Sequence, residues 1–220
     1  MGFYRSRNSG RSRTLVGLQN RSACKQTGSC SHDVGSYRRS SEGSIQMTVQ
    51  QHLESRYLDL NLHRTWIAEE LGCAVFPLWN LSGQIVGYQR YRPNASKEKN
   101  NDPREGRYFT RVKEGKVGVW GLESWHLSDT LFITEGVFDA CRITARGYSA
   151  IGLLSFDVSA TTKRWLWTVR KFRRVVAVCD NDPSGLKLRT LAHTSTVVEG
   201  YGDLGDASEE YVTHLLKKYS

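Results

Sequence analysis

The sequence predicts an α/β fold with a parallel sheet flanked by helices, and two stretches indicate it. Residues 131–140 and 175–185 each begin with a short run of β-branched and apolar side chains, as in a buried strand. Both runs end on carboxylates followed by glycine. In open α/β sheets the carboxyl ends of the strands form the edge where ligands bind. We therefore expect Glu135, Asp180 and Asp182 to converge, although 45 residues separate the first two.

Three carboxylates at one edge need a compensating cation, since no basic residue adjoins them in sequence. Mg²⁺ prefers oxygen ligands and keeps water molecules that phosphates can replace, and Asp180 and Asp182 would project to the same side of an extended segment. Alternatively, these acids cap a helix in which Pro183 occupies an early position. Glu135 and Gly136 on a second strand of the same kind favour the metal site.

The two acidic motifs resemble those of a known family. Glu-Gly-x-x-Asp-Ala at 135–140 and Asp-x-Asp-x-x-Gly at 180–185 are similar, in order and spacing, to the TOPRIM domain of DnaG-type primases, topoisomerases and some nucleases. The resemblance implies a Rossmann-like sheet and catalysis by Glu135, Asp180 and Asp182 with bound Mg²⁺ or Mn²⁺. It also implies that Asp139 supports the metal ligands without binding the metal.

The net charge of +9 and the pI of about 9.4 favour a polyanionic partner. Residues 1–46 hold eight Lys/Arg and two acids, so +6 of this charge lies there. This Ser/Arg-rich segment has few apolar residues, and we expect it to be disordered. It could be a nucleic-acid-binding arm, an organelle transit peptide, or an extension ahead of a native start near Met47, which we favour. Two further domains are expected, at 47–125 and 126–220.

The five cysteines show no paired spacing, and Cys73 and Cys179 lie in apolar runs, which indicates reduced thiols. Cys24, Cys30 and His32 lack the close ligand pairs of a structural zinc site. The sequence contains no apolar run of about 18 residues, the length that a membrane span needs. We expect a cytoplasmic protein in a bacterium or a phage-infected cell, with organelle import as the less favoured alternative.

The segment between residues 49 and 72 favours two helices, the second covering residues 63–71 and ending at Gly72. Residues 74–79 and 84–92 have the pattern of the two strands of a β-hairpin. Arg90 and Arg92 stand at alternate positions of the second strand and therefore lie on one face. A polar loop follows up to Gly106.

This hairpin region is also similar to the part of DnaG-type primases that precedes TOPRIM. The similarity is carried by residues 76–78, Gly83, 86–88, 107–109 and 119–122, so that the resemblance spans residues 73 to about 217. It implies a small α+β subdomain ahead of the TOPRIM domain. The run Arg-Tyr-Phe-Thr-Arg at 107–111 stands where the family has Lys-Tyr-Leu-Asn-Ser.

Basic residues of this region are the predicted contacts for nucleic acid or nucleotide. Arg and Lys can bind phosphates while interleaved aromatic side chains stack on bases. The candidates are Arg90, Arg92, Arg107, Lys113 and Lys116. For Lys113 and Lys116, a solvated hairpin edge is the alternative interpretation.

The C-terminal half predicts alternating helices and strands. Helices are expected at 138–146, 162–173, near 185–193 and up to Lys218, and strands at 149–154 and 195–198. Trp165 and Trp167 cannot share one helix face, so we expect one in the core and one exposed.

An acidic loop at 202–209 is the last candidate metal contact. DnaG-type primases have a Lys-Asp-Pro-Asp-like loop here, and Asp206 matches its first acid, while the second falls on Ser208. Asp203 could substitute for the missing acid. Asp206 and Ser208 could equally be helix N-caps.

The resemblance implies a phage or bacterial primase-like enzyme that makes short RNA primers from NTPs on single-stranded DNA. We expect a catalytic core that works with separate partners, among them a replicative helicase. Two alternatives stay open: a metal-dependent TOPRIM nuclease, and a non-catalytic single-strand-binding accessory protein. A topoisomerase is disfavoured because a tyrosine-bearing cleavage domain would not fit in 220 residues.

Overall fold

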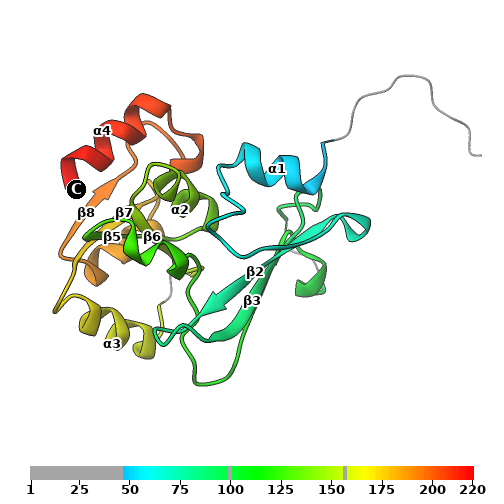
Figure 1. Ribbon diagram of the computed structural model, residues 1–220, viewed down its shortest axis with the longest axis horizontal. Coiled ribbons are helices and arrows are strands. Elements are labelled where there is room, and N and C mark those ends of the chain that lie inside the picture. Colours follow the sequence, from blue (N-terminus) through cyan, green and yellow to red (C-terminus); the bar gives the residue numbers. More distant parts are fainter. Residues whose placement is uncertain (1–46, 99–100, 156–157) are drawn as a thin grey trace, which may run out of the picture. The chain divides into compact units, whose positions relative to one another are not determined.

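The computed structural model describes residues 47–98, 101–155 and 158–220, which belong to one compact unit (Figure 1). The predictions for residues 1–46, including Cys24, Cys30 and His32, lie outside the described residues. Among the described residues, no helix has the length and apolarity that a membrane crossing requires.

The first helix, α1 (Val49–Ser55), begins with a capping box in which Thr48 accepts a hydrogen bond from the Gln51 amide. The second predicted helix, at 63–71, is wrong. Residues Trp66–Ala68 form strand β1, whose Ile67 pairs with Ala74, and only Glu69–Leu71 make a 3₁₀ turn. A neighbouring strand edge thus outweighs the helical spacing of the apolar residues.

The N-terminal sheet is antiparallel, in the order β1-β2-β3-β4, with β2 at Cys73–Trp79, β3 at Ile85–Tyr91 and β4 at Tyr108–Val112. The predicted hairpin is therefore present. Gly87 of β3 leaves no room for a side chain, because a Cβ there would lie 2.3 Å from the backbone oxygen of Arg111.

The second sheet is parallel throughout, in the order β6-β5-β7-β8, and confirms the predicted fold class. Its strands are β5 (Thr130–Thr134), β6 (Ser149–Gly152), β7 (Arg174–Cys179) and β8 (Thr194–Val197). Single bridges pair Trp79 with Val119 and Trp120 with Gly152, so that one short segment connects a strand of each sheet.

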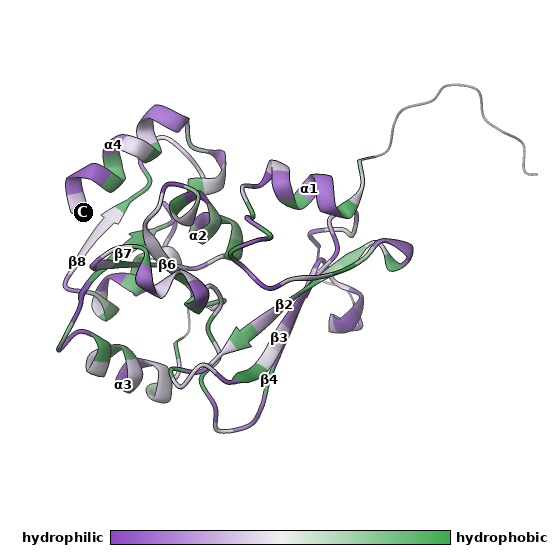
Figure 2. Cartoon of the chain, in the orientation of Figure 1, coloured by the Kyte–Doolittle hydropathy of each residue, from purple (hydrophilic) through white to green (hydrophobic). Residues whose placement is uncertain are grey.

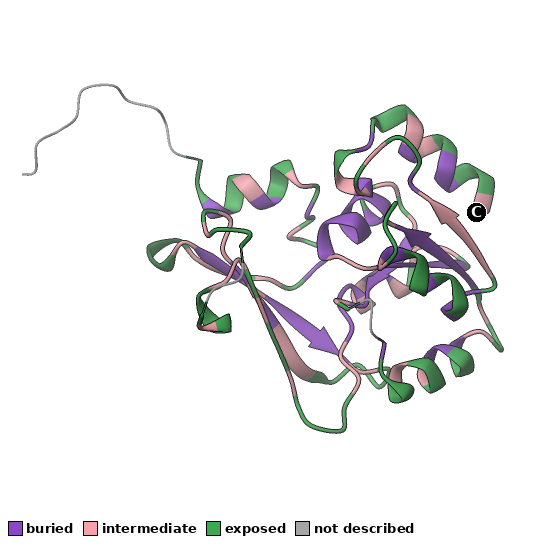
Figure 3. Cartoon of the chain, turned by 180° about the vertical axis from the view of Figure 1, so that it is seen from behind, coloured by how far each residue is buried: buried purple, intermediate pink, exposed green. Residues whose placement is uncertain are grey.

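Helices cover both faces of the parallel sheet. Helices α2 (Val137–Thr144) and α4 (Glu209–Tyr219) pack with Phe132, Val176 and Val178, whereas α3 (Ala160–Val169) packs with the side chains that point to the other face. All of α2 is buried, whereas α3 and α4 have an exposed side (Figure 3). Hydrophobic and hydrophilic residues alternate along α4 accordingly (Figure 2). The helix predicted near residues 185–193 is present as a 3₁₀ helix at Gly185–Leu191.

The antiparallel sheet shares its core with α2. The ring of Phe76 in β2 meets Phe138 of α2 edge to face at 6.2 Å between centroids, and Trp120 packs beside it. The antiparallel sheet and the helix that covers the parallel sheet therefore share one apolar core.

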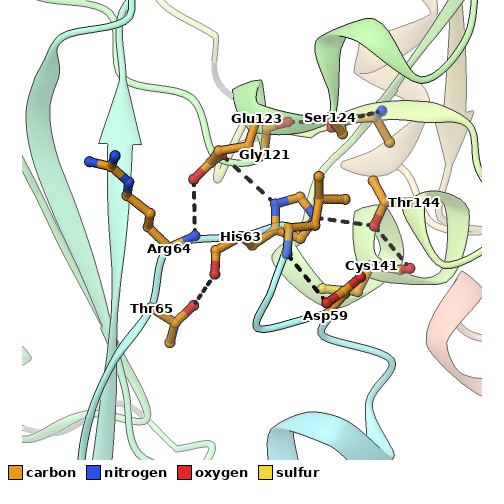
Figure 4. Close-up of polar contacts among 11 residues, drawn as sticks. Asp59, His63, Arg64, Thr65, Gly121, Glu123, Ser124, Cys141 and Thr144 are labelled. Carbon is orange, nitrogen blue, oxygen red and sulfur yellow. Dashed lines mark hydrogen bonds and ion pairs between the residues drawn. The ribbon is translucent and has the colours of Figure 1, made fainter.

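A buried histidine fastens the segment after α1 to the same helix (Figure 4). His63 is fully buried against the ring of Trp120, and its Nε2 lies 3.2 Å from the hydroxyl of Thr144 at the end of α2. Its Nδ1 is 3.8 Å from a carboxylate oxygen of Glu123. These contacts join three chain segments around α2, whose first turn faces the candidate site.

Candidate active site

Glu135 and Asp180 follow two neighbouring parallel strands. Glu135 comes directly after β5 and Asp180 directly after β7, and these strands are paired. Both side chains are half-buried, whereas Asp182 is exposed. Glu135 and Asp180 thus lie together at this edge of the sheet, and Asp182 is near enough that its charge acts on both.

The turn after Asp180 depends on glycine. A Cβ on Gly185 would lie 2.7 Å from the backbone oxygen and 2.8 Å from the backbone nitrogen of Asp180. The amide of Gly185 donates to Oδ1 of Asp182 at 2.6 Å. Asp182 thus stabilises this turn through Oδ1, and its role as a metal ligand stays a prediction.

The strand ends open into a cavity of about 350 Å³ between the two sheets. Four carboxylates line it, those of Glu135, Asp139, Asp180 and Asp203, and Arg56 is the one cation among its described lining residues. We call this cavity the carboxylate pocket. Its further lining residues come from β3, β4, α2 and the loop after β6: Gln89, Tyr108, Thr110, Gly136, Val137, Phe138 and Leu154.

Burial and mutual repulsion raise the pKa values of Asp180, Glu135 and Asp139. Burial, with the charges of Asp139 and Glu135 next in weight, raises the pKa of Asp180 to about 7. Burial also raises the pKa of Glu135, and the charge of Asp182 adds to this. The pocket therefore holds more negative charge than its surroundings stabilise.

Asp139 is the most deeply placed acid. Burial and the charge of Asp203 raise its pKa to about 6, against the opposing effects of Arg56 and of hydrogen bonds from the amides of Gly205 and Gly136. The Gly205 amide donates to Oδ1 at 3.2 Å. Asp139 thus ties α2 to the acidic loop at 202–209, which suits the supporting role expected of it.

The donor set suits a hard divalent cation. Among residues 47–98, 101–155 and 158–220, no group of three or more His, Cys, Asp and Glu side chains is arranged to hold a metal ion. Mg²⁺ does not require such a group, because it binds through one or two carboxylates and keeps several waters or phosphate oxygens. Glu135, Asp180 and Asp203 offer oxygen ligands around a pocket whose described lining holds a single cation, Arg56.

The acidic loop presents Asp203 to the pocket. Asp206 is exposed and does not line the pocket, and its amide donates to Oδ1 of Asp203 at 2.9 Å. Ser208 caps α4 by accepting a hydrogen bond from the Tyr211 amide. Capping thus accounts for Ser208, and Asp203, not Asp206, joins the other carboxylates.

The predicted basic contacts do not line the carboxylate pocket. Arg90 lies on the face of β3 opposite Gln89, with its guanidinium 5.6 Å from the ring centroid of Phe109. Arg92 pairs with Glu105 at 2.7 Å. Lys113 and Lys116 are exposed at the turn after β4.

Arg107 lines a neighbouring hollow of about 680 Å³. Tyr108 and Asp203 line both this hollow and the carboxylate pocket, so the two adjoin. Lys97 adds a second cation to the hollow. Arg107 is therefore the one predicted basic residue that the structure brings next to the carboxylates.

Sequence reasoning missed Arg56, Gln89 and Thr110. Gln89 is a buried polar residue whose Nε2 donates to the Thr110 hydroxyl at 2.8 Å on the pocket side of the sheet. A polar residue between Gly87 and Tyr91, on the strand face opposite Arg90, was the available signal. Arg56 follows the C-terminus of α1, and no local pattern distinguishes it.

No protein-family model matches the chain, and no curated protein matches it in sequence. Solved structures do match its fold. The DnaG catalytic core gives a TM-score of 0.57 at 13% identity, covering 80% of this chain and 74% of that one. The DnaG primase catalytic domain bound to ssDNA gives 0.56 at 13%, covering 80% and 75%.

The primase fragment of the bacteriophage T7 primase-helicase protein gives a TM-score of 0.50 at 14% identity, covering 67% of this chain and 62% of that one. At such low identities these likenesses establish the fold. The chain has the fold of primase catalytic cores, as the sequence motifs predicted.

Proposed function

We propose that the chain is a primase-like nucleotidyltransferase that synthesises short RNA primers on single-stranded DNA. The carboxylate pocket is the observation that carries this proposal. It collects Glu135, Asp180 and Asp203 at the edge of the parallel sheet and faces them with Gln89 and Thr110 of the antiparallel sheet. Both sheets belong to the fold shared with primase cores.

In the proposed reaction the 3′-hydroxyl oxygen of one nucleotide attacks the α-phosphorus of an incoming NTP. The new phosphorus–oxygen bond forms as the bond to the bridging oxygen breaks, and pyrophosphate leaves with that electron pair. Bound Mg²⁺ or Mn²⁺ would neutralise charge on the phosphates. Glu135, Asp180 and Asp203 would hold the ion, and Glu135 or solvent would accept the hydroxyl proton.

The surrounding residues fit substrate positioning. Asp182 would fix the turn that carries Asp180, as its bond to the Gly185 amide indicates. Arg107 and Lys97 in the adjoining hollow would hold template or triphosphate, with Tyr108 between hollow and pocket. Single-stranded DNA and NTPs are the proposed partners, and a separate helicase in phage or bacterial replication is proposed by analogy with the primase-helicase neighbour.

The test is primer synthesis by the full chain on single-stranded DNA, with labelled NTPs and Mg²⁺ or Mn²⁺. Asp180→Asn removes one of the four pocket carboxylates. Asp129→Asn is the matched control because it changes an exposed acid at the opposite end of β5. We expect labelled oligomers from the parent and the control and none from Asp180→Asn. A shortened template without oligomers would instead identify a nuclease, and an untouched template without oligomers would contradict the proposed activity.

A further inference from the structure

The outer face of α3 combines cations with an exposed tryptophan. Lys163, Trp167 and Arg170 are spaced by four and three residues and therefore share one side of the helix. The side chain of Trp167 is 62% exposed, and the Arg170 guanidinium lies 5.4 Å from its ring centroid. The neighbouring Trp165 packs against the core instead, as the sequence led us to expect for one of the pair.

A shallow hollow adjoins this side of the helix. It has a volume of about 270 Å³ and is lined by Lys163, Trp167 and Arg170 on one wall and by Thr190 and Leu191 on the other. An exposed indole at the rim of such a hollow offers one flat face to a ligand. We call these five residues the α3 surface.

The charge around the α3 surface is of one sign. Residues 158–179 contain six Lys/Arg and no Asp/Glu. Within the described part of the chain, no carboxylate forms an ion pair with Lys163, Arg164, Arg170 or Lys171. A solvated helix face would account for the lysines and arginines alone, and the exposed indole beside them adds a flat surface on which a base can stack.

We propose that the α3 surface binds single-stranded nucleic acid. An unpaired base would stack on the Trp167 ring, and the phosphates on either side would contact Lys163 and Arg170, the combination that single-strand-binding grooves use. Helix α3 covers the face of the parallel sheet opposite α2 and α4. The inference therefore goes beyond the carboxylate pocket and holds or fails independently of catalysis.

The test is a titration of the full chain in EDTA with a labelled oligothymidylate, followed by anisotropy and by quenching of tryptophan fluorescence. Parallel titrations with oligodeoxyuridylate and oligouridylate, which share a base, show which sugar the surface prefers. Trp167→Ala is compared with Trp66→Ala, since Trp66 is 53% exposed on β1. All measurements are repeated in an Asp180→Asn background, which separates this binding from the proposed catalytic pocket.

We expect Trp167→Ala to weaken binding by at least about fivefold and to remove most of the quenching, because base stacking contributes at least about 1 kcal/mol. Trp66→Ala should do neither. Equal quenching and affinity in the parent and Trp167→Ala would overturn the proposal, as would competition by duplex DNA equal to that of single strands. Either result would indicate that the exposed aromatic face binds a protein instead.

A second pair of variants tests the phosphate contacts. Lys163→Ser with Arg170→Ser should lower the slope of log K against log[salt] by about 1.4, as the loss of two phosphate contacts on a single strand requires. Lys217→Ser with Lys218→Ser on α4 removes the same charge from another exposed helix and should leave the slope unchanged. Equal slopes in both double variants would contradict the proposed contacts.

Discussion

The two sheets contribute to the carboxylate pocket in different ways. The parallel sheet supplies charged groups, Glu135 and Asp180, from the ends of neighbouring strands. The antiparallel sheet supplies neutral groups, Gln89 and Thr110, from the middle of paired strands. The order of the strands decides which strand ends come together at the pocket. For residues in the middle of a strand, the sheet face that packs against the rest of the molecule decides which side chains reach it.

This difference explains where the basic residues lie. Phe76 and Tyr91 pack against Phe138 and so fix which face of the antiparallel sheet turns toward the pocket. Arg90 is on the other face. The sheet that could have neutralised the carboxylates therefore leaves them mostly unpaired, which suits a site that recruits a cation.

The largest expected effect concerns the strand end itself. Gly185→Ala should destabilise the protein by about 3 kcal/mol, because the new methyl group would collide with the backbone of Asp180. Chemical denaturation measures this change. Gly202→Ala is the matched control, since a Cβ there meets nothing within 4 Å, and an equal loss in both variants would refute a special role for the turn.

The next effect distinguishes the two acids of the loop at 202–209. Asp203→Asn should lower the rate of nucleotide incorporation about 10- to 100-fold, as the loss of a metal-site carboxylate does, while Asp206→Asn should change it little. Asp203 lines the pocket and Asp206 does not. A larger loss of rate in Asp206→Asn than in Asp203→Asn would mean that Asp206 is the metal contact, as the motif predicted, and that the loop rearranges to present it.

A smaller effect is the pH dependence of stability without metal. The pKa of Asp180 is raised to about 7 in the folded protein, above its unfolded value of about 3.9. Protonation therefore favours the folded state, and this stabilisation is lost as pH rises from about 4 through 7.

In EDTA at pH 8, Asp180→Asn should accordingly be more stable than the parent by about 1–2 kcal/mol, a figure reduced for the partial exposure of the group. Thermal unfolding at pH 5 and pH 8 measures this difference, which should shrink at pH 5 and on addition of Mg²⁺. If Asp180→Asn were less stable than the parent at pH 8, the folded protein would have to stabilise the ionised Asp180 carboxylate.

The smallest effects concern the basic residues. Arg107→Ala should raise the KM for template or NTP about fivefold, because its side chain borders the hollow beside the pocket. Arg90→Ala and the pair Lys113→Ser with Lys116→Ser should stay within about twofold of the parent. Steady-state kinetics separates these cases, and a larger effect for Arg90 would mean that nucleic acid crosses the outer face of the antiparallel sheet.

Much of the fold was predictable because it depends on local patterns. Residue type and spacing predict the buried strands, the end of α2 before Gly147 and the hairpin around Gly83. The helix predicted at 63–71 failed because Trp66–Ala68 pair with β2, a contact between segments that the local spacing does not show.

The candidate site was predictable to the extent that strand ends define it. Glu135 and Asp180 meet as expected, but Arg56 enters the pocket from a helix end that is 79 residues from Glu135 in sequence. The choice between Asp203 and Asp206 depends on a single turn, in which the Asp206 amide bonds to the Asp203 carboxylate. Such a turn cannot be read from the order of acids in the loop.

Mn²⁺ binding to the full chain, followed by electron paramagnetic resonance without nucleic acid, tests the central claim most directly. We expect the parent to bind Mn²⁺, Asp180→Asn to bind at least about tenfold more weakly, and Asp129→Asn to match the parent. Equal binding by the parent and Asp180→Asn would contradict the claim that the carboxylates at the strand ends form a metal-dependent site.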